Sequence, residues 1–368
     1  IDTLRRDHVG CYGAARDTTP AIDALAAEAI RFDAAYATAP WTQPSVASML
    51  TGLYPSRHGL KSPARLPDVH RTLAEILRER GYATGAIVSH SLLARKLNFH
   101  KGFERWDESQ AARSARRSST DGVTRVAQRM LRQLAGTGRP FFLLVHYFDP
   151  HYEYLRHPRF GFAAERSGRL DGTQGIVKLR SLADPTPDEI AFLRDLYDEE
   201  VRHTDAGVGR LLDTIRELGL YDEALIIVTA DHGEEFHERG WIGHSRSLYD
   251  ELVRVPLVVR PPGDAPGPQV IDSAVSLVSL TPTVLDYAGV DLGPFAFQGP
   301  SWHSLLSGGG VSPGAVLVEV DFVPLRPRQF TSVHKKAIVV GRHKLIRDDG
   351  SGRLELYDLH ADPAETQD

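Results

Sequence analysis

Four short, continuous apolar runs constrain the fold of this chain more than any other feature. They are four to six residues long, and amphipathic stretches with helical spacing lie between them. Runs of this kind form strands that are buried on both faces, as in sheets with helices on both sides. The apolar runs are residues 85–88, 140–145, 224–228 and 255–259, and the clearest helical stretches are 72–80 and 187–218.

The alternation of strand and helix predicts an α/β fold over residues 1–308, with a large mixed, mostly parallel sheet sandwiched by helices. The polar, turn-rich segment 166–187 reads as a surface excursion. Beyond it, residues 309–368 are expected to form a small C-terminal antiparallel α+β subdomain packed on the first domain. Its predicted strands, joined by hairpin-like connections, are 314–320, 335–340 and 344–347.

Composition excludes several functional classes. The 368 residues are 42% hydrophobic and 25% charged, so the chain is neither disordered nor fibrous. The formal charge of -5 gives no basic field, and we expect no nucleic acid binding. Cys11 is the single cysteine, which rules out an intramolecular disulfide and a cysteine-rich zinc cluster.

No apolar run approaches the ~18 residues of a membrane span, and we expect a soluble domain. The opening residues 1–4 read as the end of a buried strand whose earlier residues are missing. An export signal or an anchor upstream therefore stays open, as do the compartment and the oligomeric state.

A candidate nucleophile lies in the segment 41–52. Thr42 suits the N-cap of a helix, Pro44 suits its first turn and Gly52 suits its C-terminal stop. Free backbone N–H groups and the helix dipole at that end favour an anion, and they also favour an alkoxide over a neutral hydroxyl. Taken alone, Thr42 reads as a helix cap, but its context favours a nucleophile.

Asp231 and His232 follow the apolar run 224–228, at the end of a predicted strand where open α/β sheets bind ligands. Asp2 also ends an apparent strand and offers a hard oxygen ligand. Each residue alone is more often a turn or capping residue. Together with Thr42 they predict one divalent cation site, which would lower the pKa of the threonine hydroxyl.

Two histidines are assigned to the same site. His151 and His244 are expected to contact an anionic oxygen, to protonate a leaving group or, with Asp149, to complete a candidate second metal site. Arg246 is expected to bind the substrate. His146 reads as a histidine of the core.

With these residues in hand, the chain resembles the sulfatase family of the alkaline phosphatase superfamily nearly end to end. The resemblance implies an alkaline phosphatase-like fold and a metal-dependent hydrolase that acts on a small anionic ester. The matching segments, in family order, are the opening 2–13, the nucleophile signature 44–52 with 54–59, the second metal motif 231–234 and the closing segment 356–365.

The departures from the family pattern bear on mechanism. In sulfatases the residue two before the Pro-Ser pair of the signature is Cys or Ser, which is converted to formylglycine, and an Arg follows the pair. Those positions hold Thr42 and Val46 here, and threonine cannot yield that aldehyde. His244 falls where sulfatases often have a substrate-binding Lys. Within the superfamily, threonine nucleophiles are typical of phosphodiesterases, some phosphatases and phosphoethanolamine or glycerolphosphate transferases.

Our leading hypothesis is hydrolysis of a phosphate ester (a phosphodiester, a phosphonate or a phosphomonoester) through a covalent phospho-threonine at Thr42. Mixed carboxylate and imidazole ligands favour Mn²⁺ or Zn²⁺ over Ca²⁺ or Mg²⁺, as one ion or two. Thr3, where many sulfatases carry a second Asp, weakens a calcium site. Three alternatives stay open: a sulfuric ester hydrolase using unmodified Thr42, a phosphoethanolamine or glycerolphosphate-type transferase, and an inactive binding module.

Overall fold

The computed structural model describes residues 1–111, 117–182, 184–263, 267–310, 314–323 and 332–368. Two sheets form its centre. One has the strand order β10-β1-β8-β5 with β9 beside β1, and the other has the order β3-β2-β4. The strands of the first are β1 (Ile30–Tyr36), β5 (Ile226–Thr229), β8 (Arg254–Arg260), β9 (Gln269–Ile271) and β10 (Val275–Ser276), and those of the second are β2 (Ala83–Val88), β3 (Arg105–Asp107) and β4 (Phe141–His146).

Parallel pairing predominates in these sheets, as predicted. β2 pairs in parallel with β3 and β4, and β1 does so with β9 and β10. β8 is antiparallel to its two neighbours, β1 and β5. The four apolar runs of the sequence form β2, β4, β5 and β8. β2 and β8 are buried almost throughout, as expected of strands with helices on both sides, whereas most residues of β4 and β5 are half-buried.

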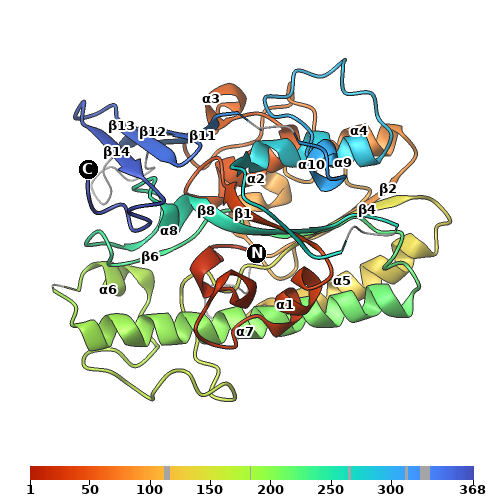
Figure 1. The fold of residues 1–368 in the computed structure, drawn as a ribbon. Helices are drawn as coiled ribbons and strands as arrows, with labels where there is room; N and C mark the ends of the chain where they lie inside the picture. The colour runs from red at the N-terminus through yellow and green to blue at the C-terminus, as the bar shows by residue number, and fades with distance from the viewer. Residues whose placement is uncertain (112–116, 183, 264–266, 311–313, 324–331) are drawn as a thin grey trace.

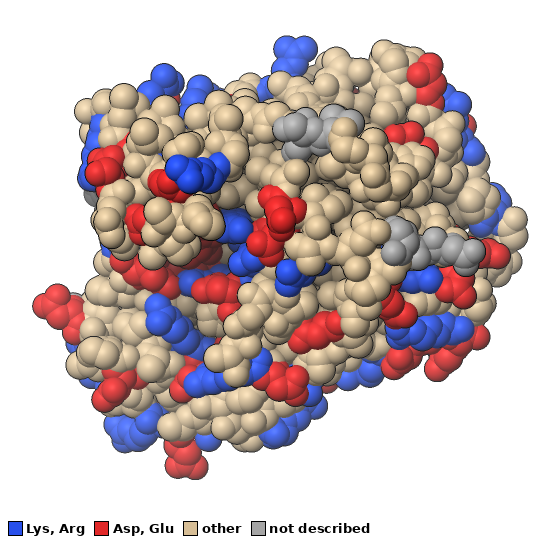
Figure 2. Space-filling view, viewed as in Figure 1, with Lys and Arg blue, Asp and Glu red and all other residues tan. Residues whose placement is uncertain are grey.

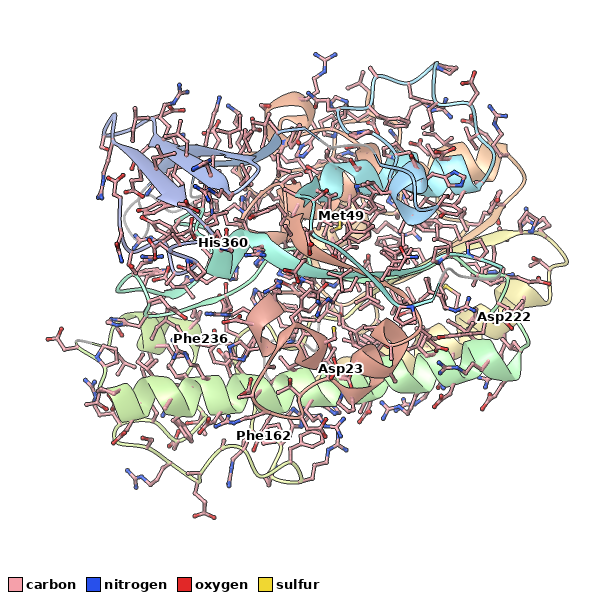
Figure 3. The ribbon with its side chains drawn as sticks, in the orientation of Figure 1. Asp23, Met49, Phe162, Asp222, Phe236 and His360 are labelled. Carbon is pink, nitrogen blue, oxygen red and sulfur yellow. The ribbon has the colours of Figure 1, made fainter. Side chains whose placement is uncertain are left out.

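Helices cover both faces of the central strands (Figure 1). On one side lie α1 (Pro20–Ala26), α5 (Thr120–Ala135) and α7 (Pro187–Glu217), and on the other lie α2 (Thr42–Thr51), α4 (Leu73–Glu79) and α9 (Leu280–Tyr287). Figure 3 shows Met49 of α2 and Phe236 on opposite sides of the sheet. A capping box between Thr186 and Glu189 fixes the start of the long helix α7.

The remaining elements are short. They comprise the helices α3 (Pro55–His58), α6 (Ile176–Arg180), α8 (Asp250–Val253) and α10 (His303–Leu306), and the hairpin strands β6 (Glu235–Phe236) and β7 (Ile242–Gly243). Turns of 3-10 helix occupy η1 (Arg6–His8), η2 (Gly10–Tyr12), η3 (Ser91–Leu93), η4 (Arg95–Leu97) and η5 (Leu277–Ser279).

A four-stranded antiparallel sheet forms the C-terminal part of the chain. Its strands follow one another in space, β11 (Val316–Phe322), β12 (Val333–Val340), β13 (His343–Asp348) and β14 (Leu354–Asp358). It shares an apolar core with Leu252 and Val253, so it packs on the larger part of the molecule. Lys344 is fully buried, with ion pairs to Asp250 and Glu365 at 2.7 and 2.8 Å. The subdomain boundary at residue 309 stays a prediction.

Two expectations from the sequence need correction. The segment 166–187 is more than a surface excursion, because it contains α6 and buries Leu170 and Leu179. Residues 1–4 are not a strand in the structure, although their backbone bonds to the ends of two strands. None of the helices described here is both long and apolar enough to cross a membrane. On the face shown in Figure 2, basic and acidic side chains are interspersed.

Candidate active site

Four predicted residues from three distant parts of the chain meet at one buried point. The Thr42 Oγ1 lies 3.3 Å from the His232 Nε2, and that nitrogen lies 3.5 Å from the Asp2 Oδ1 and 3.7 Å from the Asp231 Oδ2. All four side chains are at most 2% exposed. The predicted cation-site residues therefore lie together.

Thr42 is the first residue of α2 and not its N-cap, so that detail of the prediction is wrong. Trp41 takes the N-cap position because its backbone is extended, with φ -162° and ψ 156°. Thr42 still lies in the first turn, where the unpaired N–H groups and the dipole favour an anion. The Ser45 Oγ donates to the Asp231 carbonyl at 2.6 Å and ties this turn to the loop after β5. Gly52 ends the helix in the left-handed conformation, as predicted.

The donor set fits a divalent cation. Both carboxylate oxygens of Asp2 and the Oδ2 of Asp231 are buried without a hydrogen-bond partner. The Asp231 Oδ1 is held by the N–H groups of Thr3 at 3.2 Å and His232 at 3.0 Å, which leaves the Oδ2 free. Burial, reinforced by the charge of Asp231, raises the pKa of Asp2 well above its usual range. Buried carboxylates of this kind are satisfied by a cation.

Backbone hydrogen bonds set the tautomers of two site histidines. The Nδ1 of His232 lies 2.8 Å from the Gly233 carbonyl oxygen, and the Nδ1 of His151 lies 2.7 Å from the Tyr152 carbonyl oxygen. Carbonyl oxygens only accept, so each Nδ1 carries the proton and each Nε2 presents a lone pair. These Nε2 atoms can take a proton or bind a metal.

His244 has the same tautomer through a carboxylate. Its Nδ1 lies 2.9 Å from the Oε1 of Glu234, a fully buried residue that the sequence motif contains but that we did not predict as a site residue. The His244 ring centroid lies 4.5 Å from that of His232 and 5.0 Å from that of His151. Burial lowers the pKa of His151 and of His244 well below the usual range, so both are neutral near pH 7.

Next to Thr42 is a cavity of about 420 Å³ that His151 and His244 also line. Two arginines stand at its wall. The Arg246 guanidinium lies 3.7 Å above the Trp241 ring, and the Arg180 guanidinium lies 5.1 Å from the same ring. These cations and the neutral histidines suit a small anionic ligand.

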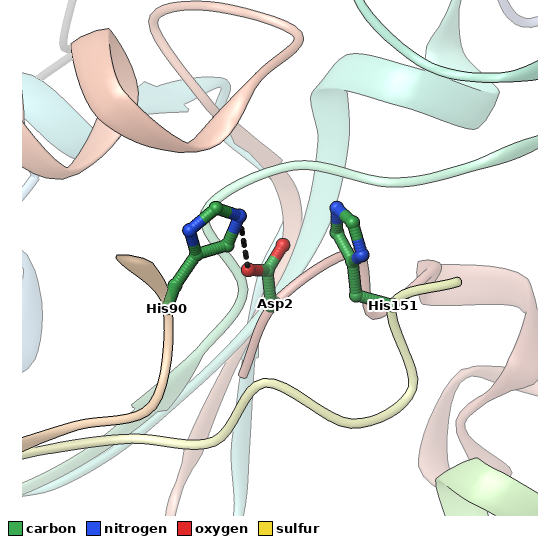
Figure 4. A group of neighbouring side chains, drawn as sticks. All are labelled: Asp2, His90 and His151. Atoms are coloured by element: carbon green, nitrogen blue, oxygen red, sulfur yellow. Dashed lines mark ion pairs between the residues drawn. The ribbon is translucent and has the colours of Figure 1, made fainter. Parts of the chain in front are cut away.

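Three further residues near this site were not predicted. His90 and His146 point toward Asp2, with their Nε2 atoms 3.9 and 3.7 Å from its Oδ2, and Asp2 lies between His90 and His151 (Figure 4). His90 follows the end of β2. Ligands bind at the carboxyl ends of strands in open α/β sheets, so the argument that indicated Asp231 could also have indicated His90. Arg180 had no signal, because the short helix α6 shows no periodicity in the sequence.

Asp149 does not join this cluster in the structure. Its carboxylate accepts hydrogen bonds from the N–H groups of Ser119 at 2.9 Å and Thr120 at 3.0 Å, at the N-terminus of α5. Hydroxyl groups of Ser118 and Thr120 donate to it as well. Its oxygens are therefore already used as a helix cap.

Family comparisons agree with this geometry. A family model described as Sulfatase matches residues 1–290. The chain belongs to the sulfatase family. A second model, described as N-sulphoglucosamine sulphohydrolase, C-terminal, matches residues 237–368. Both the predicted family and the predicted alkaline phosphatase-like α/β fold are thereby confirmed, and the chain is a hydrolase that acts on ester bonds.

Curated sulfatases are similar over most of the chain. Human arylsulfatase A is 29% identical, over 99% of this chain and 76% of its own. N-acetylglucosamine-6-O-sulfatase of Bacteroides thetaiotaomicron is 24% identical, over 97% of this chain and 79% of its own. Human N-sulphoglucosamine sulphohydrolase is 28% identical over 79% of this chain, which spans 60% of that relative.

Solved structures show the same fold. A structure in complex with its substrate D-glucosamine-2-N,6-O-disulfate aligns with a TM-score of 0.82 at 22% identity, over 100% of this chain and 91% of that chain. The phosphonate monoester hydrolase from Silicibacter pomeroyi aligns with a TM-score of 0.76 at 23% identity, over 98% and 88%. The sulfatase fold therefore houses both sulfated-sugar and phosphonate ester chemistry among its solved members.

Proposed function

We propose that this sulfatase-family chain is a metal-dependent hydrolase of phosphate esters (a phosphodiester, a phosphonate or a phosphomonoester) with Thr42 as its nucleophile. The observation that carries the proposal is the position of Thr42, on the first turn of α2 with its Oγ1 3.3 Å from the His232 Nε2. Threonine cannot be converted to the formylglycine that sulfatases form from Cys or Ser. The hydroxyl must therefore act unmodified, as it does in phosphoryl transfer.

The reaction proceeds in two displacements. The Thr42 Oγ attacks phosphorus in line with the leaving oxygen, its bond to phosphorus forms, and the bond to the leaving oxygen breaks. The proton of the hydroxyl passes to the bare Nε2 of His151 or His244, and from there it reaches the leaving oxygen, which departs on the opposite side of phosphorus, through water. Water attacks the phospho-threonine in the second step, releasing the phosphorus acid and restoring the hydroxyl. Arg246 and Arg180 hold the anionic substrate at the cavity wall.

Asp2, Asp231 and His232, with the Thr42 hydroxyl, would hold a divalent cation. When bound, such an ion lowers the pKa of a hydroxyl and neutralises charge on the transferring group. The unpartnered oxygens of Asp2 and Asp231 support this assignment. Oxygen and imidazole donors together favour Zn²⁺ or Mn²⁺ over Ca²⁺ or Mg²⁺. A second ion would have to rely on His151 and His244, because Asp149 caps α5.

Sulfuric ester hydrolysis through unmodified Thr42 is the second candidate. It is favoured by the relatives, which are sulfatases such as arylsulfatase A, and by the sulfated sugar in one solved neighbour. Both candidates share a small anionic ester as substrate and the same residues. They differ in the central atom of the ester, so substrate preference separates them.

The test is hydrolysis of a p-nitrophenyl panel by metal-stripped protein that has been reconstituted separately with Mn²⁺, Zn²⁺, Mg²⁺ and Ca²⁺. The panel contains a phosphodiester, a phosphomonoester, a phosphonate monoester and a sulfate. Thr42→Ala should abolish activity. The matched control is Thr51→Ala, which changes a buried threonine at the other end of α2 whose hydroxyl bonds within the helix to Ala47. Faster cleavage of the sulfate, or an active Thr42→Ala variant, would refute the proposal.

A further inference from the structure

Two arginines lie against one aromatic ring in the wall of the cavity beside Thr42. The guanidinium of Arg246 lies 3.7 Å from the centroid of the Trp241 ring, and that of Arg180 lies 5.1 Å from it. Arg180 is the last residue of α6, which packs against β7 and lies just below β6 in Figure 1, whereas Arg246 follows β7. Two separate segments therefore bring positive charge to one place. We call Arg180, Trp241 and Arg246 the arginine subsite.

Backbone and rings around Arg180 hold its guanidinium in one position. Its Nε donates to the Ile242 carbonyl at 3.0 Å, and the Tyr152 ring lies 5.4 Å from the guanidinium carbon. Gly243 leaves the space that the guanidinium occupies, because a Cβ at this position would clash with the Arg180 Nη2. A guanidinium that is already held in place loses little side-chain entropy on binding, and its planar fork matches the oxygens of a carboxylate, phosphate or sulfate.

The charge of Arg180 has no carboxylate partner among the residues that the structure describes. Other arginines of the fold have one, as Arg169 does in Glu189 at 2.7 Å. Glu153 is the one carboxylate among the described residues that line the cavity, and it forms no ion pair with Arg180. Burial and the charge of Arg180 lower the pKa of Arg246, so the two cations disfavour each other. An anion that contacts both would remove this repulsion.

The arginine subsite is distinct from the reacting centre. Thr42 and Arg180 share no direct contact, and the contacts that connect them run through three rings. The Thr42 Oγ1 lies 3.3 Å from the His232 Nε2, and the His232 and His244 ring centroids are 4.5 Å apart. The Tyr152 ring stacks on that of His244 at 5.3 Å, and Arg180 lies beyond it. A ligand whose reacting atom lies at Thr42 therefore meets Arg180 with another of its groups.

We propose that the arginine subsite binds a second anionic group, a carboxylate, phosphate or sulfate, on the organic part of the ester. This inference rests on the proposed function, which puts the reacting phosphorus at Thr42, and it narrows the substrates to esters with two anionic groups. Arg180 is the specificity-determining residue. Its Nη atoms donate to oxygens of the second group, the rings of Tyr152 and Trp241 shield its faces from water, and Arg246 adds positive charge.

The first test measures binding without turnover. Titration calorimetry on protein reconstituted with Zn²⁺ or Mn²⁺ compares alkylphosphonates with ω-carboxyalkylphosphonates of matched chain length, in a short, a medium and a long pair. In at least one pair the carboxylate should lower the Kd by roughly tenfold, the effect of one hydrogen-bonded ion pair. Arg180→Gln should remove this preference and Arg180→Lys, which lacks the planar fork, should reduce it. Lys178→Gln, at an exposed position on the same helix, is the control and should keep it.

Two results of the calorimetry would overturn the arginine subsite. One is the absence of a preference for the carboxylate at all three chain lengths. The other is an equal loss of affinity for both members of a pair in Arg180→Gln, which would place Arg180 at the reacting group instead.

The second test measures turnover of p-nitrophenyl phosphodiesters whose other alcohol is either a plain alkyl chain or an ω-carboxyalkyl chain. The parent protein should favour the carboxyalkyl ester in kcat/KM by roughly tenfold, mainly through a lower KM, and Arg180→Gln should favour neither. Cleavage of both esters at equal rates contradicts the subsite and leaves the proposed function standing. If neither ester is cleaved but the carboxylate preference in binding persists and depends on Arg180, the subsite stands and the proposed reaction fails.

Discussion

At the scale of single residues, hydrogen-bond partners decide what each histidine can do. His151, His232 and His244 all donate from Nδ1 and present a bare Nε2, while His90 accepts from the Leu92 N–H at its Nδ1 and therefore presents an Nε2–H. The site thus contains three Nε2 atoms with a free lone pair and one neutral N–H donor, that of His90. Burial keeps the pKa of His90 low, at about 3, so that donor stays neutral over the whole working range.

Glu234 should act through His244, because its carboxylate holds the tautomer that exposes the His244 Nε2. We predict that Glu234→Ala lowers kcat/KM by about 10- to 100-fold, the usual effect of losing a partner that orients a site residue. Glu234→Gln, which keeps an oxygen acceptor, should lose less. Steady-state kinetics across pH 5 to 9 measure both, and unchanged kinetics in Glu234→Ala would show that His244 needs no such partner.

We expect the Asp2 carboxyl group to destabilise the metal-free protein and to be needed for cation binding. This group is buried beside Asp231, and burial raises its pKa, so an amide that cannot ionise favours the metal-free fold at pH 8. We predict that metal-stripped Asp2→Asn melts a few degrees above the metal-stripped parent protein, and that its melting temperature no longer rises with Zn²⁺ or Mn²⁺. Asp272→Asn, at an exposed position, is the control and should change neither value. A full metal-dependent rise in Asp2→Asn would remove Asp2 from the cation site.

The sequence identified those site residues that lie at the start of a predicted helix or at the end of a predicted strand. Thr42 begins a helix that was read from Pro44 and Gly52, and Asp231 follows a strand that was read from its apolar run. His146 was read as a core histidine, yet both of its ring nitrogens are buried without a hydrogen-bond partner. Only packing could show this, because a sequence gives no account of which polar atoms remain unpaired. Arg180 was missed because it lies on the short helix α6, which shows no period in the sequence, and only tertiary structure brings it to the cavity.

At the scale of elements, a buried carboxylate holds the β6–β7 hairpin together. The Glu235 Oε1 accepts from the Arg239 N–H at 3.0 Å and from the Trp241 N–H at 3.1 Å. Burial raises the pKa of Glu235 from 4.5 to about 7. A raised pKa means that the folded state holds the proton more tightly, so this contribution to stability is present below pH 4.5 and is lost as pH rises through 7.

Glu235→Gln should remove that loss, because the amide oxygen can keep both hydrogen bonds without ionising. Relative to the parent protein, we predict that the variant gains up to about 3 kcal/mol of unfolding free energy between pH 5 and pH 8. Urea unfolding at the two pH values measures the gain. Glu165→Gln, at an exposed position, should show no such trend. If the free energy of unfolding of Glu235→Gln falls relative to that of the parent protein as pH rises from 5 to 8, the assigned ionisation of Glu235 is wrong.

Several of the central elements were predicted, and the failures have physical causes. The four apolar runs and the helix at 187–218 were found because burial imposes their patterns. β14 was overlooked because its alternation is short and half-exposed, and α6 because five residues cannot show a helical period. The helix start at Thr42 was off by one residue, since the N-cap depends on the extended backbone of Trp41 and not on side-chain type.

At the scale of the whole molecule, topology brings the chemistry together. The carboxyl ends of β2, β4 and β5 all lie near Asp2. His146 is the last residue of β4, and His90 and Asp231 follow β2 and β5 closely. Ligands bind at this edge in open α/β sheets generally. The cavity wall, with Arg180 and Arg246, comes instead from loops and a short helix, and loops of this kind set specificity. The strand ends thus position the candidate cation-site residues, while loops and a short helix form the cavity wall.

The most direct test of the central claim is to trap the covalent intermediate. Protein reconstituted with Mn²⁺ or Zn²⁺ is mixed with the best phosphorus ester of the panel, quenched in acid within the first turnovers and digested for mass spectrometry. We predict one phosphoryl or phosphonyl group on Thr42, absent from Thr42→Ala and present in Thr51→Ala. Turnover with no adduct at any time, or an adduct on another residue, would contradict Thr42 as the nucleophile.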